Sequence, residues 1–183
     1  MVTTIARSWM KSPDRRIPSA GAVADPPAEA LRLFNEHGGA IYRFCRSMLR
    51  NESEAEDVVQ ETFLKLLQHL KADSVRSNTR SWLFTVAANA CRDRMRWRMR
   101  WLPWSEEEDQ RTVPPSEDDE DRQRARATLR QLAPRDRMLL SLRANGLSYR
   151  EIAVATGIRE QSVGRLLARA VDRWKRAVDR RLV

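Results

Sequence analysis

The sequence is poor in the residues from which metal centres, redox sites and phosphate-binding loops are built. Its 183 residues include only 2 cysteines, 2 histidines and 6 glycines. Cys45 and Cys91 show no CxxC spacing, so we expect two buried thiols of a reducing compartment rather than a metal or redox pair. An HExxH motif, a glycine-rich phosphate loop and a convincing nucleophile–base pair are all missing. An enzyme is therefore not indicated, and we expect no catalytic residue, no metal and no cofactor.

Long apolar runs are also missing. No stretch approaches the roughly 18 apolar residues that cross a bilayer, so we expect no membrane insertion. The N-terminal segment is basic but has no apolar run behind it, which argues against a secretory signal and for a cytoplasmic protein. Hydrophobic residues make up 42% of the chain and charged residues 32%, with little glycine, which favours a helix-rich globular protein. We predict an all-α fold.

Charge is present in excess but is distributed unevenly. The net charge is +9, yet residues 105–121 hold nine acidic residues and one arginine, a net charge of −8. Residues 122–183 carry +11, and residues 91–101 carry a further +4. Clustered like charge destabilises a compact chain and usually anticipates a polyanionic partner, nucleic acid first. Composition alone does not separate DNA from RNA or from a membrane surface.

The spacing of apolar residues predicts two small helical domains joined by an acidic connector. Residues 1–28 contain four prolines and no periodicity, so we expect a disordered leader there. Residues 29–102 form the first predicted domain, and residues 122–183 form the second. The acidic residues are concentrated in residues 103–121, for which we predict a flexible linker.

Three helices are expected in the first domain. The first is expected to break or bend at Gly38-Gly39, because glycine is costly inside a helix. The second should begin with a capping box formed by Ser53 and Glu56. The third should start near Thr79.

The end of the third helix is ambiguous. Over residues 94–101 arginine alternates strictly with methionine and tryptophan, which by period alone indicates a strand. We still predict helix, because good helix formers lead into this segment and no partner strand is visible elsewhere.

The second domain carries a helix-turn-helix pattern. Ser148 and Glu151 form a capping box that begins the first helix. Ala153 supplies the small residue where the helices cross, and Gly157 supplies the residue that takes positive φ in the turn. Val163 then anchors the second helix in the shared core. These residues at these separations favour a DNA-binding module.

The second helix of such a module lies in the major groove, with its N-terminal residues near base edges. Arginine pairs with guanine, glutamine pairs with adenine, and serine or arginine holds phosphates. The residues in position to do so are Arg159, Gln161, Ser162, Arg165 and Arg169. The alternative is an ordinary solvated helix face. The module by itself indicates DNA binding and no more.

Four strings resemble one family. Those in the first domain, DVVQETF at residues 57–63 and WLFTVAANACRDRMR at residues 82–96, resemble region 2 of the extracytoplasmic-function sigma factors. Those in the second, LAPRDR at 132–137 and LSYREIA at 147–153, resemble region 4. Their order and spacing are preserved over about residues 29–181. The chain is thus similar to the extracytoplasmic-function (ECF, group 4) sigma factors of the sigma-70 family.

This resemblance implies a function: a non-catalytic subunit that directs core RNA polymerase to specific promoters and initiates transcription, often in response to stress or another signal. In the family, region 2 docks on the clamp helices of the β′ subunit and region 4 on the β flap. The residues that match the β′-docking face are Asp57, Gln60, Glu61 and Leu64. Without the resemblance, these residues would be interpreted as an ordinary solvent-exposed helix face with i,i+4 ion pairs.

The family's region 2 also recognises the −10 promoter element and captures unstacked bases, which requires basic residues and pockets or aromatic platforms. The residues that the resemblance assigns to this surface are Arg80, Trp82, Asn89, Arg92, Asp93, Arg96 and Trp97. The loop at residues 71–78 belongs to the same surface. At least one of Trp97 and Trp101 is expected to pack against the protein instead.

The resemblance also implies a regulatory partner and a role for the acidic connector. The family is usually held inactive by an anti-sigma factor, so such a partner is expected. The acidic connector would either thread into the nucleic-acid channel of the polymerase or serve as a soluble spacer.

The sequence departs from the family in its recognition helix. The family's GTVKSRL is replaced by QSVGRLL at residues 161–167, and Gly164 inside a helix costs about 1 kcal/mol relative to alanine. The shifted basic positions imply that the −35 element, which region 4 reads, has its own sequence here. A stand-alone helix-turn-helix regulator is the main alternative function, and an RNA-binding adaptor is a third.

Overall fold

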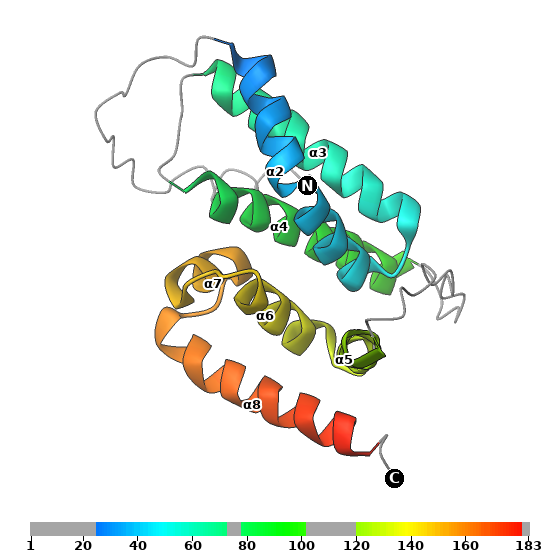
Figure 1. Ribbon diagram of the computed structural model, residues 1–183. Coiled ribbons are helices and arrows are strands. Elements are labelled where there is room, and N and C mark those ends of the chain that lie inside the picture. Colours follow the sequence, from blue (N-terminus) through cyan, green and yellow to red (C-terminus); the bar gives the residue numbers. More distant parts are fainter. Residues whose placement is uncertain (1–24, 73–77, 102–119, 181–183) are drawn as a thin grey trace.

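The computed structural model describes residues 25–72, 78–101 and 120–180, and all regular structure within these ranges is α-helical. The predicted fold class, two helical domains without strands, is confirmed (Figure 1). The first domain consists of α2 (Pro26–Leu49), α3 (Glu52–Lys71) and α4 (Thr79–Trp101). The second consists of α5 (Glu120–Gln131), α6 (Pro134–Ala144), α7 (Tyr149–Thr156) and α8 (Glu160–Asp179). In the described ranges no helix is both long and apolar enough to cross a membrane.

The first domain packs α2 against both α3 and α4. Its core is formed by apolar residues that recur at helical spacing on the three helices. The largest of those that are almost completely buried are Ile41, Met48, Leu49, Val58, Leu83 and Phe84. The rings of Phe44 and Phe84 meet edge to face, with centroids 5.6 Å apart. Burying one large apolar side chain stabilises the fold by about 1.5–3 kcal/mol, so this cluster holds the three helices together.

The structure corrects three expectations about α2 and α3. Helix α2 begins at Pro26, inside the predicted leader, because proline is tolerated in a first turn and Asp25 caps the helix. It continues through Gly38-Gly39 without a break, and the ring of Phe34 lies only 3.3 Å from where a Cβ of Gly38 would stand. The predicted capping box at Ser53 is also wrong: Asn51 is the N-cap of α3, and its side chain accepts from the backbone N–H of Glu54.

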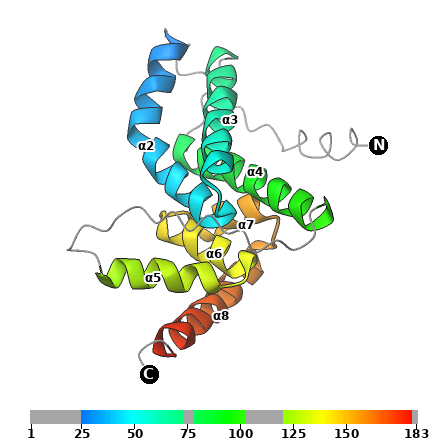
Figure 2. The same cartoon turned by 90° about the vertical axis from the view of Figure 1, so that its right-hand side faces the viewer.

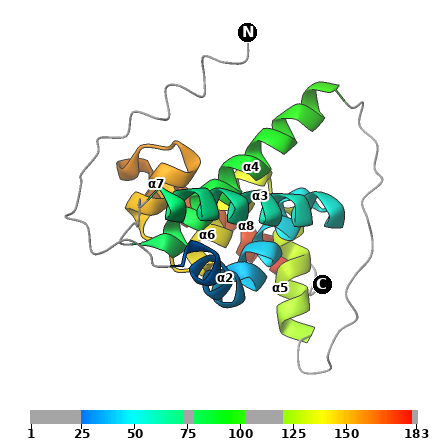
Figure 3. The same cartoon turned by 90° about the horizontal axis from the view of Figure 1, so that it is seen from above.

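Helix α4 confirms the choice of helix over strand for residues 94–101. Asn78 caps it, with its Oδ1 accepting from the backbone N–H of Ser81 at 3.0 Å. The side chains of Leu83, Phe84, Ala87, Ala88 and Cys91 are fully buried. Seen from above, the C-terminal end of α4 extends beyond the other helices (Figure 3). One helix therefore supplies both a core face and an exposed basic end.

The two cysteines are buried, free thiols, as predicted. Cys45 lies on α2 and Cys91 on α4. The adjacent Cys45 thiol and burial both raise the pKa of Cys91 above its ordinary value. A thiol that stays protonated is a poor nucleophile and a poor metal ligand, so Cys91 serves as a small apolar core residue. Cys45 is also fully buried in the same core.

The second domain packs its helices around a smaller core. The residues of that core with no exposed surface include Leu139, Leu142, Ile152 and Val163. Helix α5 begins at Glu120, so the last two residues of the predicted linker are helical. An ion pair between Asp136 and Arg173 links α6 to α8.

The two domains pack against each other. Helix α7 lies along α4, and α6 also touches α2 (Figures 1 and 2). Arg50, at the C-terminal end of α2, donates to the carbonyl of Arg130 on α5, which also accepts from Arg137 at 3.1 Å. Burial, and then the charges of Arg50 and Arg130, lowers the pKa of Arg137 to about 10. The chain as described is thus a single packed body built from two domains.

Candidate nucleic-acid and partner-binding surfaces

The helix-turn-helix forms as the sequence predicts. The side chain of Ser148 accepts from the backbone N–H of Glu151, and the carboxylate of Glu151 accepts in return from the backbone N–H of Ser148 at 2.8 Å. Gly157 ends α7 in the left-handed region at φ 71°, which a residue with a side chain rarely adopts. Ala153 and Val163 are both buried between the helices. The turn therefore fixes the direction in which α8 leaves α7.

The residues predicted to contact the −35 element lie at the N-terminal end of α8 and along its outer side. Arg159 is the N-cap residue, and its carbonyl accepts from the backbone N–H of Ser162 at 2.9 Å. Arg159, Gln161, Arg165 and Arg169 are exposed, and Ser162 is half-buried. Four of the five are thus available to a nucleic-acid partner, together with the N-terminal backbone donors of α8.

The structure gives a physical reason for Gly164. The ring of Tyr149 lies 3.3 Å from the position that a Cβ of Gly164 would occupy. The guanidinium of Arg143 lies over the same ring, 5.6 Å from its centroid. Tyr149 nevertheless remains 46% exposed, beside the recognition helix. The glycine lets this aromatic ring pack closely on α8, which sequence reasoning did not foresee.

The predicted polymerase-docking residues all lie on α3. Asp57, Gln60 and Leu64 are exposed, and Leu64 is 61% exposed despite being apolar. Glu61 is half-buried and forms ion pairs with Lys65 at 2.6 Å and with Arg94 of α4 at 3.6 Å. The structure therefore brings three of these residues to the surface, while the fourth also has a structural role.

The residues predicted to contact the −10 element divide into two groups along α4. Asp93, Arg96 and Trp97 lie near its projecting end and are exposed, Trp97 by 59%. Arg80, Asn89 and Arg92 lie nearer to the second domain, and the last two are half-buried. Trp97 is thus mostly exposed, and the side chain of Trp101 lies outside the described part, so the expectation that one of them packs against the protein stays a prediction. The structure does not gather the seven residues into one open patch.

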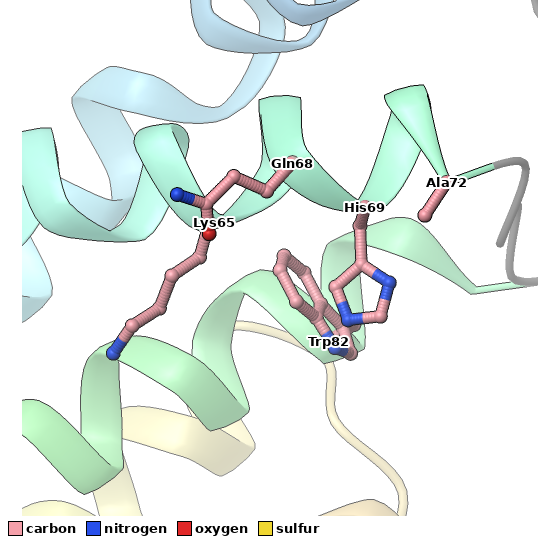
Figure 4. A pocket seen from close by; sticks show the side chains of 5 residues that line it. All are labelled: Lys65, Gln68, His69, Ala72 and Trp82. Atoms are coloured by element: carbon pink, nitrogen blue, oxygen red, sulfur yellow. The ribbon is translucent and has the colours of Figure 1, made fainter.

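Trp82 lies apart from these groups, in an open cavity between α3 and α4 (Figure 4). The cavity has a volume of about 320 Å³ and is lined by Lys65, Gln68, His69, Ala72 and Trp82. The rings of His69 and Trp82 meet edge to face, with centroids 4.8 Å apart. Sequence reasoning missed the three lining residues on α3. The available signal was their position in the last two turns of α3, just before a polar loop. Residues 73–77 of that loop lie outside the described residues.

Polar contacts between the domains involve Asn89 and Arg92, the half-buried residues of α4 named above. Nη1 of Arg92 donates to the carbonyl of Thr156 at 2.8 Å, and Nη2 donates to the side chain of Asn89. At the other end of α7, the side-chain amide of Asn78 donates to the carboxylate of Glu151. Burial alone would raise the pKa of Glu151, but hydrogen bonds from Ser148 and Ser81 and the nearby charge of Arg80 lower it below its ordinary value. Glu151 is therefore held as a carboxylate that serves both domains.

Comparison with known proteins matches both domains to one family. Residues 33–100 match Sigma-70 region 2, and residues 122–173 match Sigma-70 region 4. The RNA polymerase sigma factor CarQ of Myxococcus xanthus is 33% identical over 132 residues, which cover 69% of this chain and 75% of CarQ. The ECF RNA polymerase sigma factor SigL of Mycobacterium tuberculosis is 39% identical over 79 residues, 42% of this chain and 44% of SigL. The match to SigL thus spans less than half of that relative's length.

Two solved structures share the fold. The sigma factor RpoE in complex with the anti-sigma factor NepR from Bartonella quintana superposes with a TM-score of 0.67 at 23% identity, over 82% of this chain and 97% of that one. CnrH in complex with the cytosolic domain of CnrY gives a TM-score of 0.60 at 26% identity, over 86% and 92%.

The ordered match of regions 2 and 4, on a fold shared with a solved sigma factor, defines the class: this chain belongs to the sigma-70 family. Within that family it is similar to SigL, an extracytoplasmic-function sigma factor.

The packing of Tyr149 on Gly164 can be measured in a double-mutant cycle. In a Tyr149→Ala background, Gly164→Ala should raise the free energy of unfolding by about 1 kcal/mol, the gain in helix propensity. In the native background the gain should be smaller, because the new Cβ meets the tyrosine ring. Urea unfolding of the four proteins, followed by circular dichroism, checks this. Equal gains in both backgrounds would contradict the contact.

Proposed function

We propose that this chain is an RNA polymerase sigma factor that directs core polymerase to specific promoters and initiates transcription. The observation that carries the proposal is the ordered match of regions 2 and 4, each on a helical domain with an exposed charged face. Residues 29–102 would bind core polymerase and the −10 element, residues 103–121 would connect, and residues 122–183 would bind the −35 element. In this role the chain acts in the cytoplasm as a non-catalytic specificity subunit of the group 4 type.

Docking on core polymerase is proposed to use the outer face of α3, on the β′ clamp helices, with region 4 on the β flap. An interface usually combines an apolar anchor with a charged rim. Leu64 supplies an exposed apolar side chain, and Asp57 and Gln60 are exposed beside it on the same helix. The carboxylate of Glu61 is already paired with Lys65 and Arg94, so its larger role is to join α3 to α4.

Recognition of the −10 element is proposed to use α4 and the cavity beside Trp82. Single-stranded bases are held by aromatic platforms next to cations that bind the backbone. The cavity provides an indole and an imidazole, with Lys65 at its edge, in a space large enough for one nucleobase (Figure 4). Arg96 and Trp97 lie farther along α4, are exposed, and would form a separate part of the −10 surface. Opening a duplex requires such a site, because an unstacked base must be captured.

Recognition of the −35 element is proposed to use the N-terminal half of α8 in the major groove. Arg159, Gln161 and Arg165 are exposed there and carry the groups that pair with base edges or phosphates. The close contact of Tyr149 with Gly164 places an exposed phenol beside this helix. Because this recognition helix differs from the family pattern, we propose a −35 preference of its own.

An anti-sigma factor is the proposed regulator, and the signal would reach the chain through that partner. Support comes from RpoE, whose solved structure contains the anti-sigma factor NepR, and from CnrH, which is bound to the cytosolic domain of CnrY. These partners belong to the relatives, and a counterpart for this chain is an expectation from the shared family.

Run-off transcription with purified core polymerase over a library of genomic promoter fragments tests the function. Adding the chain should produce promoter-specific transcripts that core polymerase alone does not make. The absence of such transcripts, together with the absence of a complex with core, would reject the sigma-factor proposal. Dimeric binding to a palindromic duplex without polymerase would support the stand-alone regulator instead.

The docking face can be tested at Asp57, which is exposed and forms no ion pair with another residue of the described ranges. Asp57→Arg should weaken binding to core polymerase by about tenfold, or roughly 1.4 kcal/mol, because a charge at an interface rim is reversed. Glu56→Arg is the matched control: Glu56 is exposed on the same helix, but its charge acts on Tyr42 of α2. Fluorescence anisotropy measures the affinity, and circular dichroism verifies the fold. Equal losses in the two variants would reject this face.

A further inference from the structure

A cluster of three arginines lies where the end of α2 meets α5 and α6 (Figure 2). Arg50, the C-cap residue of α2, and Arg137, near the start of α6, both donate to the carbonyl oxygen of Arg130 in the last turn of α5. Two guanidinium groups of the same charge therefore meet at one oxygen atom. The charge of the Arg130 side chain acts on both of them. Three positive charges are thus gathered in one place, where like charges repel one another.

Arg137 is the most deeply buried member of this cluster, with only 4% of its surface exposed. Its Nη1 donates to the carbonyl of Arg130 at 3.1 Å, but its Nε is buried without a hydrogen-bond partner. Burial, followed by the positive charges of Arg50 and Arg130, lowers the pKa of Arg137 to about 10. The guanidinium therefore still carries its charge at neutral pH. Burying a charged group is costly unless an opposite charge or a full set of hydrogen bonds compensates it.

The N-terminal end of α6 adds backbone donors at the same place. Its N-cap residue is Ala133, which has no side-chain acceptor, and the helix is 11 residues long. The first N–H groups of a helix lack partners within it and lie at the positive end of its dipole. The side chain of Arg137 runs back past this end, because it reaches the carbonyl of residue 130. Asp136, the acidic residue of the first turn, is paired with Arg173 of α8, so its carboxylate is engaged with another helix.

We propose that Arg50, Arg130 and Arg137 form a binding site, at the N-terminal end of α6, for the phosphate group of a small molecule. Guanidinium groups bind phosphate oxygens through short charge-assisted hydrogen bonds, and a helix N-terminus supplies further donors and a favourable dipole. A phosphate group in this position accepts from the buried Nε of Arg137. It also offsets the repulsion among the three arginines.

Charge and burial decide which ligand the site takes. Three cations require more than one negative charge, and a phosphate monoester carries about −1.5 to −2 at neutral pH. The backbone of a DNA duplex is too bulky to reach Arg137, which is almost completely buried, whereas a small anion can enter beside Arg130, which is exposed. Inorganic phosphate and a nucleotide both carry the required group. None of the three arginines is among the residues proposed to contact promoter or core polymerase, so the inference goes beyond the proposed function.

Titration and thermal unfolding of the full chain test the site without polymerase or DNA. Isothermal titration calorimetry with inorganic phosphate gives the Kd, and a parallel titration with adenosine 5′-monophosphate shows which source of the phosphate group binds more tightly. At ten times its Kd, inorganic phosphate should raise the Tm by about 3–6 °C relative to sodium chloride of equal ionic strength, because it binds only the folded chain. If neither probe binds to the native chain, the proposal is overturned.

Three variants locate the binding. Arg137→Met removes the buried charge but keeps a long side chain, so it should weaken phosphate binding by roughly tenfold or more. Arg130→Gln changes an exposed side chain, leaves the backbone carbonyl in place, and should weaken binding by roughly threefold. Arg150→Gln removes an exposed arginine of α7, beyond the opposite end of α6, and is the matched control that should bind phosphate like the native chain.

The comparison among variants separates this site from general effects of phosphate. Phosphate salts stabilise folded proteins without binding a site, and this part of the Tm rise is the same in all four proteins. A rise as large in Arg137→Met as in the native chain, or an affinity that Arg130→Gln leaves unchanged, would overturn the proposal. If Arg137→Met does not fold, the affinity of Arg130→Gln decides alone.

Discussion

The structure depends on one helix, α4, which is required both in the core and at the surface. Leu83, Phe84 and Cys91 fill the centre of the first domain without exposed surface. The arginines between and after them cannot enter that core, because an unpaired buried charge costs more than burial of its stem returns. They are consequently displayed along the remaining faces of α4. The cavity beside Trp82, the ion pair to Glu61 and the contact with α7 all follow from this division.

The second domain contains a helix, α7, that depends on the first domain for part of its stability. Helix α7 is only eight residues long, too short to be stable alone, so it depends on its caps and on packing. Ser148 and Glu151 satisfy its first backbone donors, and Arg92 of the other domain satisfies a carbonyl at its end. The contact that covers part of the α4 surface therefore also helps complete the helix-turn-helix. The stability of α7 therefore depends in part on a residue of the first domain.

Much of the fold could be predicted from the sequence, because local rules decided it. The capping box at Ser148 and the left-handed Gly157 are confirmed, since each depends only on neighbouring residues. Val163 is confirmed as buried, since the helical period places it on the apolar face of α8. Gly38-Gly39 did not break α2. Gly38 is buried, and the ring of Phe34, one turn earlier on the same helix, packs over it and meets Phe63 of α3, so packing against α3 outweighs propensity. Asn51 caps α3 in place of Ser53. Both residue types can cap a helix, and α3 begins two residues earlier than a cap at Ser53 would place it.

The candidate site was less accessible to sequence reasoning. The sequence shows which side chains α4 carries, but not which of them the second domain covers. Only the structure shows that Arg92 contacts α7 whereas Arg96 is exposed. His69 was missed for the same reason, because its significance comes from Trp82 across the cavity. From the sequence, Gly164 only lowers the stability of its helix. The structure shows that the ring of Tyr149 packs where a Cβ at this position would lie. The roles of these residues in binding remain predictions.

A distance measurement between the domains tests the account most directly. Spin labels on Glu56→Cys of α3 and Asp172→Cys of α8, both exposed positions, would report the separation of the domains by pulsed electron paramagnetic resonance. The free chain should give one narrow population at the separation that the packing of α7 on α4 sets. A broad distribution, or one centred at a longer distance, would contradict the account.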